Sequence, residues 1–106
     1  MNKILRAVVF TGLSLFLSCA TLLPEPQGPD LAYASYVHHA PVQLKDLQMG
    51  RKLYITHCAA CHDLHRPNEL APSGWQDVMT RMQPKAKIDD PTRDSILLYL
   101  TTMAGK

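Results

Sequence analysis

The chain has 106 residues and a formal net charge of +2, which leaves room for one small domain at most. Lys3 and Arg6 account for that excess, so the rest of the chain has equal numbers of basic and acidic side chains. A near-neutral chain without a basic stripe excludes nucleic-acid binding as its function.

Residues 1–19 have the pattern of a secretory signal peptide. Lys3 and Arg6 precede an apolar stretch that is too short for a membrane-spanning helix, which needs roughly 20 residues. Two interpretations of the cleavage site remain open, because Cys19 either leaves with the signal peptide or is the lipidated cysteine of a lipoprotein. We therefore expect export to the bacterial periplasm, with membrane anchoring if Cys19 carries lipid.

Residues 20–41 are rich in proline and show no sustained apolar period. This composition predicts an extended, loosely ordered tether or a wrap over the domain. The domain itself is expected at residues 42–106. A core of that size usually needs a metal, disulfides or a cofactor to be stable.

Three helices are expected in this domain, and no segment alternates as a strand would, so the predicted fold class is all-α. The first helix spans about residues 43–56, with apolar residues at helical spacing. The second begins with Ser73 as N-cap, followed by Gln76 in a capping-box pattern. The third begins with Asp90 as N-cap and Pro91 at the first helical position, and it ends near Gly105.

The sequence Cys58-Ala59-Ala60-Cys61-His62 has the chemistry needed for covalent haem attachment. Two thiols three positions apart can add across the two vinyl groups of one haem, and His62 then lies under the iron as proximal ligand. A redox dithiol would instead be expected in a βαβ setting, which the sequence lacks. A zinc site would need a further cluster of ligands after His65, and a disulfide between Cys58 and Cys61 would close a strained small ring.

Residues around this motif resemble those of class I cytochromes c. The matching patterns are Gly50-x-x-x-Tyr54, Ile96-x-x-Tyr99 and Leu70-Ala71-Pro72. The resemblance covers about residues 44–103 and implies a compact fold of about three helices around one covalent haem c. It also implies that Gly50 lets the first and last helices touch, and that a proline carbonyl after the motif accepts the other N–H of the proximal imidazole.

The resemblance implies a methionine as the distal iron ligand, between the motif and the last helix. Met82 is the first choice because it lies near the end of the second helix, just before Gln83-Pro84, and Met79 is the second choice. Either side chain could instead be a packing residue on the apolar face of that helix. Histidine ligation is the main alternative, and His38 and His39 lie on a segment that could fold back over the haem. His65 is too close to His62 to reach the opposite face easily, and His57 lies just before the motif on the same side.

The expected function is that of a periplasmic one-electron carrier between redox partner proteins. No catalytic acid–base pair is apparent, so we do not expect an enzyme, although the role of electron-accepting subunit of a dehydrogenase fits the same features. The alternative is a haem-based sensor or small-molecule catalyst with an open or displaceable sixth iron position. Arg81, Lys85 and Lys87 form a small basic cluster that is either solvated or faces an acidic partner, and Trp75 is expected to pack in the core or against the haem.

Overall fold

The described residues form four α-helices and one short 3-10 helix. The structure is a computed structural model and describes residues 23–59 and 64–105. In chain order the elements are α1 (Asp30–His38), α2 (Leu44–Cys58), η2 (Pro67–Glu69), α3 (Pro72–Ala86) and α4 (Asp90–Met103). No strand occurs within these two ranges, so the predicted all-α fold class is confirmed.

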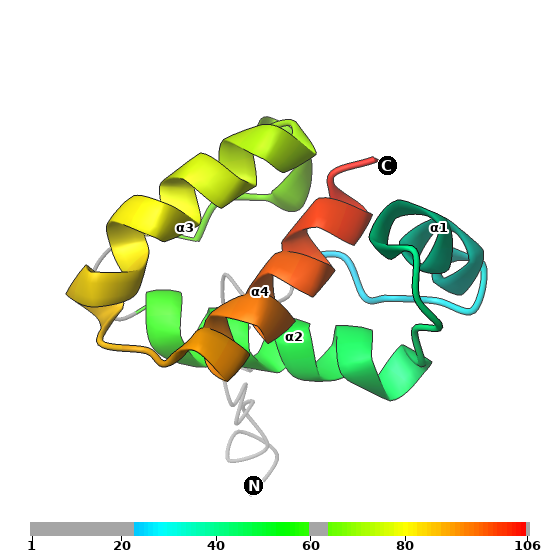
Figure 1. Cartoon of the computed structure of the whole chain (residues 1–106), viewed down its shortest axis with the longest axis horizontal. Helices are drawn as coiled ribbons and strands as arrows, with labels where there is room; N and C mark the ends of the chain where they lie inside the picture. The colour runs from blue at the N-terminus through cyan, green and yellow to red at the C-terminus, as the bar shows by residue number, and fades with distance from the viewer. Residues whose placement is uncertain (1–22, 60–63, 106) are drawn as a thin grey trace, which may run out of the picture.

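The centre of the fold is the crossing of α2 and α4 (Figure 1). Gly50 of α2 lies directly against the backbone of Ser95 and against Tyr99 in α4. A Cβ atom added at Gly50 would overlap the Ser95 carbonyl oxygen and lie 2.8 Å from the Tyr99 Cβ. The crossing of the first and last domain helices, which the resemblance to class I cytochromes c implies, is therefore present in this fold.

A buried cluster extends from this crossing to α3. Its members are all nearly inaccessible to solvent: Leu23, Tyr54, Trp75, Met79, Ile96, Tyr99, Leu100 and Met103. Leu23 belongs to a segment preceding the helices, so the core is closed by chain that the sequence analysis placed outside the domain. Burial of such side chains contributes roughly 1.5–3 kcal/mol each, which makes this cluster the main source of stability.

The segment at residues 23–27 is fastened to the outside of the α2–α4 crossing. The Tyr99 hydroxyl donates to the Pro24 carbonyl at 2.8 Å, and Arg51 donates to the Leu23 carbonyl at 3.3 Å and pairs with Glu25 at 3.3 Å. Burial raises the pKa of Tyr99 to about 12, so its hydroxyl stays a proton donor throughout the physiological range. This part of the chain forms an ordered wrap.

Helix α1 is a difference from the sequence prediction, which gave no helix before residue 42. Asp30 starts it, with its Oδ2 accepting from the Gln27 N–H at 2.7 Å, and His39 ends it in the left-handed conformation. Only Asp30 and Ala34 of this helix are buried. One small side chain is enough to pack it against α4, so it carries no apolar stripe that a periodicity analysis could detect.

Two predicted helix starts were wrong by one or two residues. Helix α3 begins at Pro72 with Ala71 as N-cap, and Ser73 lies inside its first turn. Helix α4 is capped by Asp89, whose Oδ1 accepts from the Thr92 N–H at 2.9 Å. Hydrogen bonding from the Thr92 side chain, and then from its N–H, lowers the pKa of the Asp89 carboxyl group. In both helices the proline near the start fixes the backbone, so the residue before it or two before it takes the cap position.

Helix α2 continues two residues further than predicted and ends at Cys58. None of the described helices is both long and apolar enough to span a membrane.

His38 joins α1 to α4, and its burial makes the stability of the domain depend on pH. Its Nε2 lies 3.1 Å from the Thr101 hydroxyl, and burial together with the neighbouring His39 lowers the His38 pKa from 6.5. A lowered pKa means that the folded protein binds a proton less readily than the unfolded chain, so stability is lost as the pH falls below about 6.5. We expect the melting temperature to decrease between about pH 7.5 and about pH 5.

The variant His38→Gln should show a smaller decrease over the same pH range, because the titrating group is gone. His39→Gln is the matched control, since His39 is exposed and should leave most of the dependence in place. Equal pH dependence in the wild type and in His38→Gln would contradict this prediction.

Candidate functional site

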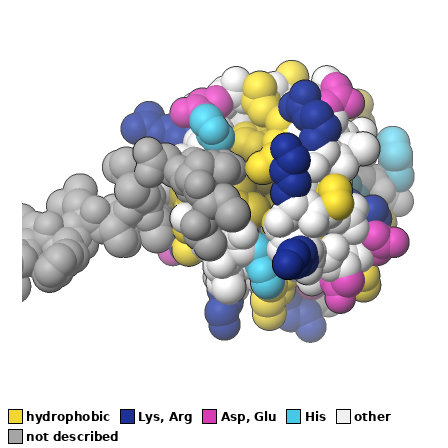
Figure 2. Space-filling view, turned by 90° about the vertical axis from the view of Figure 1, so that its left-hand side faces the viewer, with side chains coloured by type: hydrophobic (Ala, Val, Ile, Leu, Met, Phe, Trp, Pro, Cys, Tyr) yellow, Lys and Arg dark blue, Asp and Glu magenta, His cyan; other side chains and the backbone are white. Residues whose placement is uncertain are grey.

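A mostly apolar cavity of about 590 Å³ lies between the end of α2, the η2 region, α3 and one residue of α4. Its volume lies within the range of about 300–1,000 Å³ that is typical of small-molecule and cofactor sites. Fourteen residues line it: Tyr54, His57, Cys58, His65, Glu69, Leu70, Trp75, Val78, Met79, Arg81, Met82, Lys85, Ala86 and Leu100. Figure 2 shows hydrophobic side chains gathered on this side of the molecule, with Lys and Arg side chains along one border.

The α2 wall places part of the predicted attachment motif at the cavity. Cys58 is the last residue of the helix, is half-buried and lines the cavity together with His57. The other two predicted haem-binding residues, Cys61 and His62, lie outside the described residues, as does Cys19. The position of Cys58 is fixed because α2 is held at Gly50 by its contact with α4.

The α3 wall carries both candidate methionines. Met79 is 3% exposed and belongs to the buried core cluster, whereas Met82, one turn later, is half-buried and lines the cavity without belonging to that cluster. The sequence predicted both on one face of this helix, and the structure places both at the cavity wall. Met82 therefore has the thioether that is less committed to core packing.

Trp75 is fixed by contacts with two other parts of the wall. Its indole N–H donates to the Pro67 carbonyl at 2.7 Å, and its ring meets Tyr54 edge-on with a centroid distance of 6.1 Å. Trp75 is 3% exposed, which confirms its predicted place in the core. This hydrogen bond to the Pro67 carbonyl holds η2 against α3.

Tyr54 anchors the chain that returns after the attachment motif. Its hydroxyl donates to the His65 carbonyl at 2.9 Å, and its ring lies 6.4 Å from that of Tyr99. Burial is the largest cause of a raised Tyr54 pKa, followed by the neighbouring Cys58. The hydroxyl therefore remains a donor and keeps residue 65 beside α2.

Ionisable side chains border the cavity at two places. His65 Nδ1 lies 2.7 Å from Glu69 Oε2 near η2, and Arg81 and Lys85 line the wall formed by α3. Lys87, the third member of the predicted basic cluster, is the left-handed C-cap of α3 and does not line the cavity. The pairing of His65 with Glu69 has no signal in the sequence, because it depends on a short 3-10 helix without periodicity.

Two of the four histidines considered as alternatives to methionine line the cavity, and the other two lie elsewhere. His57 and His65 line the cavity, whereas His38 lies at the contact of α1 with α4, where it borders a second, shallower cavity. His39 is exposed just after α1. Among the residues that the structure describes, no group of three or more His, Cys, Asp or Glu side chains could hold a metal ion.

Comparison with known proteins gives one match. A family described as dihaem cytochrome c matches residues 54–106, which is half of the chain and includes the attachment motif, α3 and α4. No curated protein and no solved structure matches the chain.

Proposed function

Because the chain belongs to the dihaem cytochrome c family, we propose that this c-type cytochrome is a periplasmic carrier of single electrons. Covalent haem c is the cofactor that membership of this family implies. Bound haem supplies an iron that changes between its ferrous and ferric states by one electron. The redox partners are proposed to be proteins that dock at the cavity side.

The cavity is the observation that carries this proposal, because its volume and lining residues suit an iron porphyrin. The walls of the cavity are largely apolar, as a hydrophobic macrocycle requires. The volume of the cavity lies in the range that is typical of cofactor sites. Cys58 stands on one wall, and two thioethers, Met79 and Met82, stand on another. Arg81 and Lys85 at the border offer positive charge to the propionate groups of a haem.

We propose Cys58 and Cys61 as the two points of thioether attachment and His62 as the proximal ligand. In this arrangement, the end of α2 presents the first thiol to the cavity, and Cys61 and His62 follow three and four residues later in the sequence. The family has two haems, whereas residues 1–106 contain a single Cys-x-x-Cys-His motif. We therefore propose one haem on this chain, as in the class I cytochromes that the sequence resembles.

Met82 is the proposed distal ligand. Met79 packs with Trp75 and Leu100 in the core, so turning its sulfur toward iron would disturb that cluster. Met82 lies at the cavity without that commitment and close to the end of α3. A soft thioether ligand raises the reduction potential relative to a second histidine.

Export, cleavage after the signal peptide and lipid attachment at Cys19 complete the proposal. Their support is the basic and apolar pattern of residues 1–19 together with the need for haem attachment outside the cytoplasm. Mass spectrometry of the protein purified from bacterial membranes and periplasm tests all three, because the intact mass reports the start of the mature chain and any lipid.

The attachment itself is tested by extracting the protein with acidified acetone. We expect haem to remain on the wild-type chain, with an intact mass that corresponds to one haem. Cys58→Ala combined with Cys61→Ala should release all of it, because no thioether bond remains. Cys19→Ala is the matched control, since this third cysteine plays no part in haem attachment.

Two results would contradict the proposed function. An intact mass with two haems would show that the chain carries two haems, as the name of its family indicates. Ready binding of carbon monoxide by the ferrous protein would point to an open sixth position, and thus to a sensor or small-molecule catalyst.

A further inference from the structure

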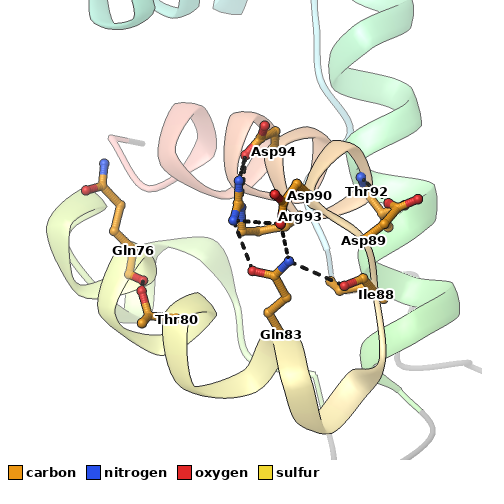
Figure 3. A network of polar contacts seen from close by, with 9 residues as sticks. All are labelled: Gln76, Thr80, Gln83, Ile88, Asp89, Asp90, Thr92, Arg93 and Asp94. Atoms are coloured by element: carbon orange, nitrogen blue, oxygen red, sulfur yellow. Dashed lines mark hydrogen bonds and ion pairs between the residues drawn. The ribbon is translucent and has the colours of Figure 1, made fainter.

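The end of α3 is tied to the start of α4 by polar contacts that converge on Gln83 (Figure 3). Its Nε2 donates to Asp90 Oδ1 at 2.7 Å and to the Ile88 carbonyl at 3.3 Å, and its Oε1 accepts from Arg93 at 3.1 Å. Its backbone carbonyl accepts from the N–H groups of Lys87 and Ile88. One residue thus holds the turn between two helices with both its side chain and its carbonyl.

Arg93 is itself held in place by the two acids beside it on α4. It donates to Asp90 at 3.1 Å and to Asp94 at 2.9 Å, and the bond to Asp94 raises its pKa. Exposed ion pairs of this kind contribute little to stability singly. Their effect here is geometric, because a guanidinium with two carboxylate partners has few other orientations available.

The last turn of α3 needs an external support because Pro84 lies inside it. A proline has no N–H, so it cannot donate the hydrogen bond that helix geometry directs to the carbonyl of Thr80. The backbone bonds of this turn are therefore fewer than in an ordinary helix. The position of this turn therefore depends on its contacts with α4, and Gln83 makes these contacts through Asp90 and Arg93.

Met82 is the residue immediately before Gln83 and lies on a different side of the same turn. Successive residues of an α-helix are rotated by about 100°, so Met82 can line the cavity while Gln83 reaches α4. A movement of the last turn would shift both side chains together. The network on one side of α3 therefore sets the position of the sulfur on the other side.

We propose that Gln83 is a positioning residue, which holds the thioether of Met82 at the distance from which it ligates the haem iron. This inference rests on the proposed function of the cavity and on Met82 as distal ligand. Loosening Gln83 lets Met82 leave the iron more often. An added ligand then competes more successfully for the vacated position.

Imidazole titration of the ferric protein, followed by its absorption spectrum, measures this competition. Gln83→Leu removes all three side-chain hydrogen bonds of Gln83 and should bind imidazole roughly tenfold more tightly than the wild type. Of these bonds, Arg93→Gln removes only the one to Gln83 Oε1 and should tighten imidazole binding by a smaller factor. The double variant should resemble Gln83→Leu, because Arg93→Gln removes a contact that the leucine has already removed. Arg93→Gln acts from α4 and leaves α3 unchanged in sequence.

Thr80→Val is the matched control on the same helix. The Thr80 hydroxyl donates to the Gln76 carbonyl at 3.0 Å within α3 itself and makes no link to α4 (Figure 3). It should therefore leave the imidazole affinity unchanged, even if the melting temperature moves slightly.

Three outcomes would overturn the proposal. If Gln83→Leu lowers the melting temperature without changing imidazole affinity, the network only stabilises the fold. If Thr80→Val tightens imidazole as much as Gln83→Leu, the effect belongs to α3 in general. If the wild-type ferric spectrum lacks the weak far-red band of methionine–iron ligation, the ligand assignment fails too, which distinguishes that failure from the first two.

Discussion

Replacing Gly50 with alanine should destabilise the domain by about 3 kcal/mol, at the upper end of the usual cost of overpacking. The new Cβ would overlap the Ser95 carbonyl oxygen and press on Tyr99, and neither α2 nor α4 can move without opening the core. Urea denaturation followed by circular dichroism measures the loss. Since the crossing also fixes Cys58 at the cavity, the yield of haem-loaded protein should fall with the stability.

Gly74→Ala is the matched control, because Gly74 also lies in a helix but has space around it. An added Cβ there would come no closer than 3.4 Å to a neighbouring atom, which belongs to Leu70. Alanine should stabilise this helix by roughly 0.5–1 kcal/mol, because glycine loses more backbone entropy on folding. The two glycine variants are thus expected to differ in sign, and a similar loss in both would contradict the role given to Gly50.

Replacing Met82 with leucine should abolish methionine–iron ligation while leaving the fold intact. Leucine keeps most of the volume and removes the sulfur, a kind of exchange that usually costs less than about 1.5 kcal/mol. The weak far-red band of the ferric protein should disappear, and the reduction potential should fall or the ferrous form should bind carbon monoxide. Spectroscopy and a redox titration on the same sample measure these changes.

Met79→Leu makes the same chemical change one turn earlier on α3. Because Met79 is 3% exposed within the core, this variant should alter the melting temperature more than the spectrum. If only Met79→Leu abolishes the band, the two methionines have the opposite roles. If neither variant abolishes the band, neither methionine of α3 is the sixth ligand, and this ligand assignment is wrong.

The sequence predicts those parts of the fold in which one local pattern decides the outcome. The helix crossing at Gly50 and Tyr99 was predicted from the resemblance to class I cytochromes c, and the apolar positions of α3 predict its buried face. The same helical spacing placed Met79 and Met82 on that apolar face. The helical spacing of apolar residues is a pattern among residues close in sequence, so it can be recognised without a structure.

Other features depend on contacts between distant residues, and the sequence does not predict them. Helix α1 packs through Ala34 and through His38, whose partner is Thr101, so no stripe marks it. The pairing of His65 with Glu69 at the cavity border needs a 3-10 helix that begins at Pro67. The residues of the Gln83 network look like ordinary solvated side chains until α3 and α4 are placed together.

The fastening of residues 23–27 limits how far the domain can stand from a membrane. Only four peptide steps separate Cys19 from Leu23, which span at most about 14 Å when fully extended. If Cys19 carries lipid, this short segment keeps the domain at the bilayer surface, and the domain cannot diffuse through the periplasm. Its electron exchange would then be confined to partners that come to the same surface.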